Sequence, residues 1–327
     1  MGKEFSVKFW GVRGSHPVSS ANQLRYGGNT SSIEFRVNGH IILIDAGTGI
    51  INLGKNLISS SIQANQPLNV TLLLSHLHHD HLQGFPFFSP AFILANRISI
   101  FGPDIYSRPV KDVISSVMQP PKFPLRLSDL AAKIDIAELS AHQEILVNGK
   151  SAVQMADSNL SSHAIEQDEI RISAMHSYAH PGGSFFYRID YGGKSIVYAN
   201  DTEGYVGGDR RLIHFAEGAD LLIHDAQYTQ AHYLGLGKHV RSTQGFGHST
   251  SEMACEVARE ARVRQLALVH FDPGYDDDTV MQMSLSAREV FPQAFAAYEG
   301  LEIDLFNSEK ILFEPQVFKF QDLASGD

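Results

Sequence analysis

The sequence contains a single cysteine, Cys255, among 327 residues. An intrachain disulfide and a zinc site built on several thiolates are therefore both excluded. No apolar run approaches the length of about 18 residues that a membrane-spanning helix needs. The N-terminal residues MGKEFSVKFWGVRG also lack the apolar segment of a secretory signal. We expect a protein of a reducing cytoplasm that has no membrane segment.

Basic residues are also scarce, because 26 lysines and arginines stand against 36 aspartates and glutamates, a formal net charge of −10. This balance disfavours a protein whose affinity comes mainly from gripping long nucleic acid, which needs a basic face. One local exception is residues 97–133, where six basic residues outnumber three acidic ones. That segment is either a solvated surface insert or a region that helps to draw in an anionic substrate.

Hydrophobic residues make up 43% of the chain, which is enough to fill a sizeable core. Near-continuous apolar runs are typical of strands covered on both faces, as in layered α/β proteins. Five such runs end abruptly in a polar residue and a turn: residues 41–49, 70–81, 195–204, 220–228 and 266–274. Functional residues collect where such strands end. These ends supply Asp45, His76, Asp201, Asp225 and His270.

Helical patterns lie between the expected strands. Residues 249–262 carry a helical apolar stripe, and Ser249 with Glu252 forms the pattern of a capping box at its start. Residues 102–133 contain five prolines and predict an irregular or short-helix insert. No repeat, low-complexity tract or Gly/Ser linker marks a boundary. We therefore expect a single domain over residues 1–327 with an insert at about 102–133.

The densest cluster of chemical groups is the heptapeptide SHLHHDH, residues 75–81. Side chains two positions apart in an extended or tightly turning segment point to the same side, so His76 and His78 can converge on one ion. Asp80 and His81 can then face a second ion beside it. Imidazole and carboxylate donors suit zinc, manganese or iron. Two half-sites need more ligands, and the strand-end Asp201 and His270 are natural completions, with one further histidine between residues 82 and 200.

The heptapeptide resembles the metal-binding motif of the metallo-β-lactamase superfamily, and the resemblance spans nearly the whole chain. It is carried further by FWGVRGSHP and YGGNTSS near the start, and by HPGGSFFYRI, VYANDTEG, GFGHST and LVHFDPGYDDD. These motifs are similar to the branch that contains ribonuclease Z and related phosphodiesterases. The resemblance implies a four-layered αββα sandwich with two metal ions at one edge of the paired sheets.

The same resemblance implies a role for seven residues. His76, His78 and His180 would bind the first ion, Asp80, His81 and His270 the second, and Asp201 would bridge the two. His163 and His176 lie near His180 in the sequence, but "HPGG" followed by a strand favours His180. His79 occupies the variable position of the motif and is expected to face solvent or to form a hydrogen bond.

Other positions carry weaker signals. Asp45 in LIDAG is expected behind a ligand imidazole, which it would orient, although a simple strand-end turn gives the same pattern. The resemblance to the ribonuclease Z branch implies that His248 in GHST approaches the scissile phosphate with Asp225 as its support; the alternative is a loop histidine. Four residues are candidates for the mouth of the site, although glycine-rich loops are often only turns: Arg13, Ser15, Asn29 and Thr30.

Taken together, the motifs predict a hydrolase with two divalent ions, in the first place zinc, with manganese or iron as alternatives. In ribonuclease Z proper, the family implies a glycine-rich arm that docks transfer RNA, and this sequence shows no such arm. The preferred substrate is therefore a cyclic nucleotide or another small phosphodiester. Alternatives on the same scaffold are an RNA-processing endonuclease of ribonuclease Z type and a thioester or lactone hydrolase. A zinc β-lactamase would use a cysteine near Asp201, which this chain lacks, and a metal-free binding module would have lost ligands. Dimers are common among similar proteins, which leaves a homodimer open.

Overall fold

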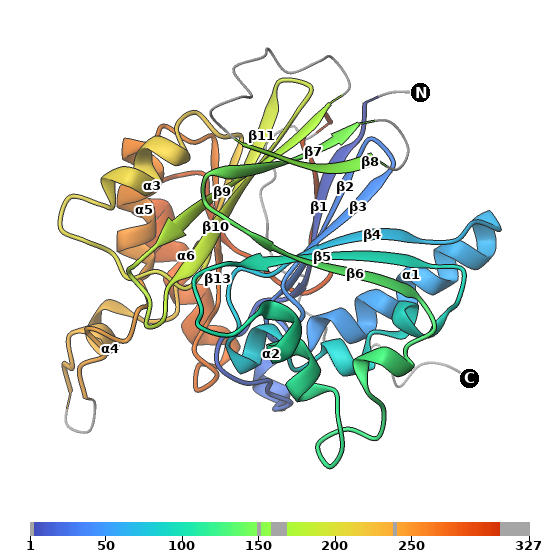
Figure 1. The fold of residues 1–327 in the computed structure, drawn as a ribbon. Helices are drawn as coiled ribbons and strands as arrows, with labels where there is room; N and C mark the ends of the chain where they lie inside the picture. Colours follow the sequence, from blue (N-terminus) through green and yellow to red (C-terminus); the bar gives the residue numbers. More distant parts are fainter. Residues whose placement is uncertain (1–2, 149–151, 158–168, 238–240, 308–327) are drawn as a thin grey trace, which may run out of the picture.

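Two β-sheets packed face to face form the centre of the molecule, and helices cover the outer face of each sheet (Figure 1). The computed structural model describes residues 3–148, 152–157, 169–237 and 241–307. The α/β class and the four-layered αββα arrangement expected from the motifs are both confirmed.

The first sheet has seven strands, with β1 to β6 in sequence order and β15 at the edge beside β1. Strands β3 to β6 run parallel to one another, whereas β1, β2 and β15 pair antiparallel with their neighbours. The strands are β15 (Glu302–Asp304), β1 (Phe5–Gly11), β2 (Ser32–Val37), β3 (His40–Ile44), β4 (Asn69–Leu73), β5 (Arg97–Pro103) and β6 (Lys133–Leu139).

The second sheet has eight strands in the order β14-β13-β12-β11-β10-β9-β7-β8. Strands β11 to β14 are parallel, and β7 to β10 are joined antiparallel. The strands are β14 (Ala294–Ala296), β13 (Gln265–Val269), β12 (Leu221–Asp225), β11 (Lys194–Ala199), β10 (Ser184–Tyr191), β9 (Ile170–Ser177), β7 (Gln143–Asn148) and β8 (Ala152–Asp157).

Helices α1 (Gly49–Ala64) and α2 (Val110–Val117) pack on the first sheet, while α3 (Arg210–Phe215), α5 (Ser251–Glu260) and α6 (Asp277–Val290) lie on the side of the second (Figure 1). The short helix α4 (Gln230–Tyr233) stands away from both sheets. Single 3₁₀ turns occupy Ala21–Gln23, His79–His81, Phe85–Phe87, Ser89–Phe92 and Leu127–Asp129. Within the described residues, none of the helices has the length and apolar character needed to cross a membrane.

The strand patterns explain the layering. In β1, Phe5, Val7 and Phe9 are completely buried and alternate with half-buried residues, as expected for a strand with one face in the core. The buried face of β1 belongs to the large apolar cluster between the two sheets, which continues beneath α5. A second cluster lies between α1 and strands β3 to β5. Burial of such side chains stabilises the fold by about 1.5–3 kcal/mol each before entropy is counted.

One expectation about local structure needs correction. Helix α5 begins one residue later than the capping-box pattern suggests, because the Thr250 hydroxyl, not that of Ser249, accepts the bond from the Met253 N–H. The Ser249 hydroxyl instead donates to the Thr202 carbonyl at 2.6 Å.

The expected insert at 102–133 is the connection between two neighbouring parallel strands. Strand β5 runs to Pro103 and β6 begins at Lys133, so the connection covers residues 104–132. Its helix α2 buries Val110 and Ile114 in the second apolar cluster. Most of this segment therefore covers the first sheet, and only its first residues approach the site described below.

The carboxyl ends of the parallel strands of both sheets meet at one edge of the sandwich. At three of these ends the backbone of a non-glycine residue is left-handed: φ is 63° at Asp45, 51° at Asp201 and 67° at His270. Such a conformation costs roughly 1–2 kcal/mol for a residue with a Cβ. Clustered outliers of this kind are typical of functional sites, where the surrounding contacts hold them in place.

Candidate metal centre

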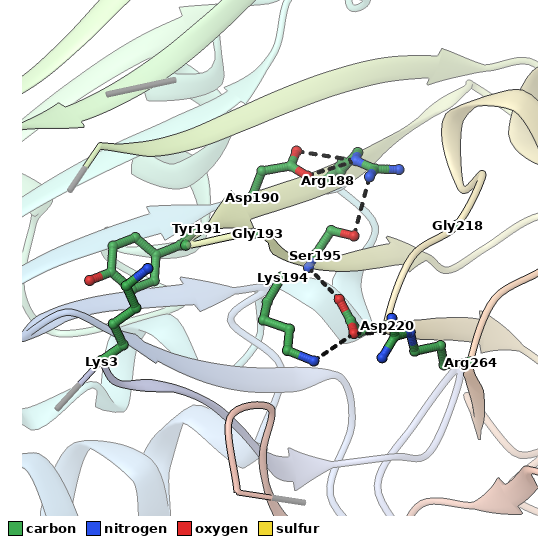
Figure 2. Close-up of a pocket in the computed structure, with 11 residues that line it drawn as sticks. Lys3, Arg188, Asp190, Tyr191, Gly193, Lys194, Ser195, Gly218, Asp220 and Arg264 are labelled. Atoms are coloured by element: carbon green, nitrogen blue, oxygen red, sulfur yellow. Dashed lines mark hydrogen bonds and ion pairs between the residues drawn. The ribbon is translucent and has the colours of Figure 1, made fainter. Parts of the chain in front are cut away.

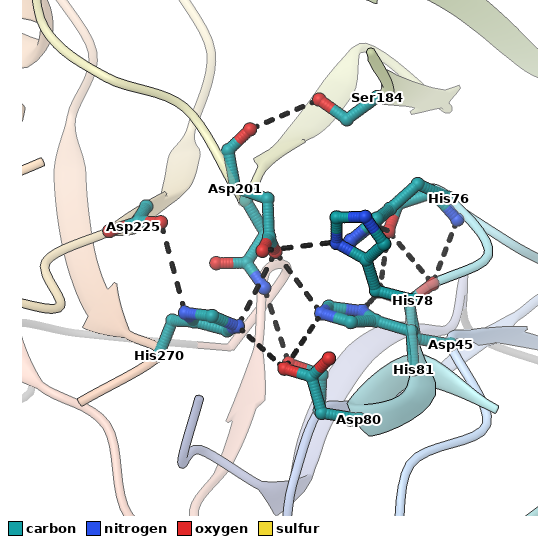
Figure 3. A network of polar contacts seen from close by, with 12 residues as sticks. Asp45, His76, His78, Asp80, His81, Ser184, Asp201, Asp225 and His270 are labelled. Atoms are coloured by element: carbon teal, nitrogen blue, oxygen red, sulfur yellow. Dashed lines mark hydrogen bonds and ion pairs between the residues drawn. The ribbon is translucent and has the colours of Figure 1, made fainter. Parts of the chain in front are cut away.

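All seven residues expected to bind metal lie in one cluster at this shared edge. Figure 3 labels all of them except His180. The segment after β4 supplies four of them, the turn between β9 and β10 supplies one, and the ends of β11 and β13 supply one each. Six side chains are buried and that of His78 is exposed at the open side. The seven are His76, His78, Asp80, His81, His180, Asp201 and His270.

The first donor group consists of His76, His78 and His180. The Nε2 atom of His180 lies 3.0 Å from Nδ1 of His78. Oδ1 of Asp201 lies 3.7 Å from Nε2 of His76 and 3.8 Å from Nε2 of His180. Donors around a tetrahedral ion with bonds of about 2.0–2.1 Å are roughly 3.3 Å apart, so these spacings suit one ion between the four side chains.

The second donor group consists of Asp80, His81 and His270. Oδ2 of Asp80 lies 3.4 Å from Nε2 of His81 and 3.3 Å from Nε2 of His270. Oδ2 of Asp201 lies 3.2 Å and 3.4 Å from the same two nitrogens. Asp201 thus directs one carboxylate oxygen toward each donor group, which is the position that a bridging ligand needs.

Unpaired polar atoms inside the cluster test whether these residues suit metal ions. Among the described residues, Nε2 of His76, His81 and His270 and Oδ2 of Asp201 are buried and form no hydrogen bond. Buried polar atoms in native proteins are nearly always bonded, so a group of four such atoms facing one another requires an explanation. Imidazole nitrogen and carboxylate oxygen are donors for zinc, iron and manganese. The two donor groups therefore fit two divalent ions.

Asp45 lies behind His81 and sets the direction of its ring. Its Oδ2 atom is 2.8 Å from Nδ1 of His81, and the carboxylate also accepts bonds from the Ser75 N–H and hydroxyl and from the Tyr198 hydroxyl. This arrangement turns Nε2 of His81 toward the cluster. Carboxylates in this position orient metal-binding histidines and raise their basicity. Tyr198 comes from the second sheet, so its 2.7 Å bond also joins the two sheets.

The other buried imidazoles are held in the same way by groups that the sequence did not reveal. Nδ1 of His270 lies 2.9 Å from Oε1 of Gln227, and Nδ1 of His180 lies 3.1 Å from the Gly247 carbonyl. Nδ1 of His76 lies 3.1 Å from the Ser75 hydroxyl. The signal for Gln227 was its place two residues after the strand-end Asp225, and Ser75 directly precedes the histidine motif.

His248 and Asp225 form a pair beside the second donor group. Nδ1 of His248 lies 2.7 Å from Oδ2 of Asp225, and Oδ1 of Asp225 accepts bonds from the Ser249 and Gln227 N–H groups. The His248 ring stacks on that of His270 at 5.0 Å. The stacking places the His248 ring next to the donor groups. Because Asp225 engages Nδ1 of His248, the other ring nitrogen, Nε2, is the one left to bind or to exchange a proton.

Of the four residues expected at the mouth, Ser15 is the exposed one, and its φ is 61°. Its N–H donates to Oδ2 of Asp80 at 2.8 Å. The backbone of Ser15, not its hydroxyl, therefore contacts the cluster. An N–H donor at this oxygen fixes the orientation of the Asp80 carboxylate.

The other three do not reach the mouth, which corrects the expectation. Arg13 is completely buried, and its guanidinium donates to the carbonyls of Gly27, Asp272 and Tyr275, so it joins the N-terminal loop to the loop after His270.

Asn29 and Thr30 likewise serve the loop itself. The Asn29 side-chain amide donates to Glu299. The buried Thr30 hydroxyl accepts bonds from the Thr48 N–H and the Gln83 amide. A sequence identifies polar residues in a glycine-rich loop, but it does not show which backbone groups surround them.

The remaining histidines near the motifs lie outside the cluster. His79 is exposed to solvent, as expected. His176 contacts the ring of Tyr178, with a distance of 4.1 Å between ring centroids, at the rim of the site. His163 lies outside the described residues. Among the described candidates, His180 is the one that joins His76 and His78.

Burial and charge divide the imidazoles into two kinds. Burial lowers the pKa of His76 and of His180, and partial desolvation by the neighbouring groups does the same for the more exposed His78, which favours the neutral form that binds metal. In the second group burial is outweighed by the carboxylates of Asp201 and Asp80. These raise the pKa of His81 well above its usual value and that of His270 to about 9. Because metal ligands must be deprotonated, an ion bound there would displace both protons.

A separate cavity of about 560 Å³ lies at the opposite end of the second sheet (Figure 2). The β10–β11 hairpin, where β11 begins, lines this cavity. Asp201 of the metal cluster follows the other end of β11. Lys194 and Arg264 pair there with Asp220, and Arg188 pairs with Asp190. This remote cavity, whose lining has four basic and two acidic side chains, is not part of the metal centre.

Two facing sheets with two donor groups at one edge are the arrangement of the metallo-beta-lactamase fold. The chain belongs to the beta-lactamase superfamily, since the model of the beta-lactamase superfamily domain matches residues 40–271. All seven residues of the cluster lie within that range.

Comparisons with individual proteins agree. The chain is 29% identical over 249 residues to ribonuclease Z of Ignicoccus hospitalis, covering 69% of this chain and 77% of that protein. It is 24% identical over 330 residues to ribonuclease Z of Picrophilus torridus, covering 95% and 98%. The metallo-beta-lactamase fold protein YhfI of Bacillus subtilis superposes with a TM-score of 0.63 at 19% identity, covering 92% of this chain and 99% of that one.

Replacement of Asp45 by asparagine tests the orienting role of its carboxylate. Asp45→Asn removes the charge that faces Nδ1 of His81, so we expect metal affinity to fall by about 10- to 100-fold. A zinc titration against a competing chelator measures this change. Asp220→Asn, a matched carboxylate in the remote cavity, serves as the control. Equal zinc affinity in Asp45→Asn and the control would contradict the role.

Proposed function

We propose that this chain is a phosphodiesterase with a dinuclear metal centre, which acts on a cyclic nucleotide or another small phosphodiester. The observation that carries the proposal is the Asp201 carboxylate between two donor groups, with the Asp225–His248 pair beside them. Donor groups alone suit many hydrolytic reactions. A positioned imidazole next to them adds the proton donor that the departure of an alkoxide requires.

Two bound divalent ions would supply a nucleophilic hydroxide at neutral pH and would offset the negative charge on the attacked phosphate. Asp80 orients the attacking water, because its Oδ2 atom is held by the Ser15 N–H and points into the cluster. The side chain is 7% exposed, and although desolvation by burial opposes ionisation, the neighbouring imidazoles of His81 and His270 keep the pKa of Asp80 well below its usual range. It is therefore an acceptor at neutral pH.

His248 donates a proton to the leaving oxygen. The Asp225 carboxylate accepts its Nδ1–H at 2.7 Å, which fixes the ring and leaves Nε2 as the atom that transfers the proton. Asp225 is itself completely buried and held by two backbone N–H groups, so the pair is rigid. This is the arrangement of a general acid oriented by a carboxylate.

Loss of the His248 imidazole separates proton transfer from metal binding. We expect His248→Ala to retain its metal content but to lose about 10²- to 10⁴-fold in turnover of a cyclic mononucleotide, whose leaving group is an alkoxide that needs a proton. Elemental analysis and chromatographic detection of the nucleoside monophosphate measure the two quantities. His214→Ala, a substitution at a highly exposed histidine on α3, is the matched control. Full activity in His248→Ala would refute the proposed role.

Two observations favour different substrate sizes. The net charge of −10 disfavours a large RNA, whose backbone needs a basic surface. The curated relatives named ribonuclease Z instead favour RNA processing, which is therefore the second candidate. Thioester or lactone hydrolysis would need the same donor groups, but it gives no role to the Asp225–His248 pair.

Direct competition between substrate classes decides among these functions. A panel of cyclic mononucleotides, a structured precursor transfer RNA, a thioester and a lactone are compared at equal enzyme concentration. We expect the highest kcat/KM on a cyclic nucleotide and weak cleavage of the RNA, because an acidic protein binds a polyanion poorly. Efficient RNA cleavage together with failure on every small diester would establish the second candidate instead.

A further inference from the structure

A cavity of about 550 Å³ adjoins the first donor group at His180. Three segments form its walls: Ile105 from the β5–α2 connection, His176 and residues 178–183 around the β9–β10 turn, and Gly245 from the loop that leads to His248. Its volume falls within the range of about 300–1,000 Å³ that is typical of small-molecule sites.

The cavity is connected to both parts of the proposed reaction centre. His180 lies in its wall and belongs to the first donor group. The Gly247 carbonyl holds Nδ1 of His180 and directly precedes His248. Glu203 braces this loop, because its carboxylate accepts the N–H groups of Gly245 and Gly247. A phosphodiester carries two substituents, and one of them can enter this cavity when its phosphorus lies between the donor groups.

The lining of the cavity favours a flat, uncharged group. Tyr178 is 73% exposed, which is unusual for so large a ring beside a site, and its ring is backed by His176 and by the Arg211 guanidinium at 5.7 Å. Ile105 and Pro181 add apolar surface, and the glycines of the turn expose backbone polar groups. No aspartate or glutamate is among the residues that line it. Aromatic surface with backbone donors and acceptors is typical of nucleobase recognition.

We propose that this cavity binds the nucleobase of the substrate and that Tyr178 is the residue on which the base packs. The inference rests on the proposed phosphodiesterase function and narrows its substrate class to nucleotide diesters. It makes Tyr178 a specificity residue that contacts the substrate away from the reacting atoms. A diester without a base would then use the same donor groups but gain nothing from the cavity.

The test compares two substrates that differ only in the nucleoside: thymidine 5′-(4-nitrophenyl) phosphate and methyl 4-nitrophenyl phosphate. Stacking on an aromatic ring predicts that Tyr178→Ala lowers the ratio of their kcat/KM values by about 10-fold or more. Tyr178→Phe keeps the ring and should restore the ratio. Leu94→Ala, at an exposed apolar residue outside the cavity, controls for surface changes. Circular dichroism verifies the fold of each variant.

A second readout distinguishes failure of the inference from failure of the proposed function. Equilibrium binding of thymidine 5′-monophosphate is measured for the same variants. If the wild-type protein hydrolyses neither diester, the proposed function fails. Even then, a loss of thymidine monophosphate affinity of about 10-fold in Tyr178→Ala, with Tyr178→Phe unchanged, supports a base site. An unchanged ratio and unchanged nucleotide affinity in Tyr178→Ala overturn the inference, as does an equal loss in Tyr178→Phe.

Discussion

The rest of the site depends on the contacts of the Asp201 carboxylate with the two groups of imidazoles on either side of it. Its two oxygens lie 3.2–3.8 Å from four histidine nitrogens that come from both sheets. Such a cluster of buried donors and acceptors is costly unless each is satisfied. The left-handed backbone at Asp45, Asp201 and His270 adds further strain at the same edge. Metal ions would satisfy the inward atoms, and outer hydrogen bonds satisfy the rest.

Those outer contacts explain why the site is built where two sheets meet. Asp45 ends a strand of the first sheet, yet it accepts a bond from Tyr198 of the second, and so it couples the sheets directly behind His81. Gln227 orients the ring of His270 through its Oε1 atom, and its amide also donates to the Tyr228 hydroxyl. Precision at the donor groups therefore depends on the packing of the whole sandwich, in keeping with the general need for a supporting layer around metal ligands.

Much of the fold and site could be predicted because the evidence is local in the sequence. Apolar runs that stop at Asp45, Asp201 and His270 mark parallel strands with a common edge, and the structure places these residues there. Tyr198 and Arg13 show the limit. A tyrosine in an apolar strand looks like core, and a loop arginine looks like a substrate contact, until the structure shows that their partners come from elements distant in the sequence.

The division of labour follows from these constraints. Most of the donors and their supports follow directly on the ends of buried strands, whereas His180, the cavity around Tyr178 and the His248 loop belong to turns and loops, which differ more readily between relatives. A common scaffold can in this way retain one reaction while its substrate changes.

The most direct test of the account is the number of metal ions bound by each chain. Purified protein is stripped with a chelator, reloaded with zinc, freed of excess metal and analysed for zinc per chain. Two donor groups that share Asp201 predict a stoichiometry of two at saturation. A stoichiometry of one, or no retained metal, would contradict the dinuclear centre.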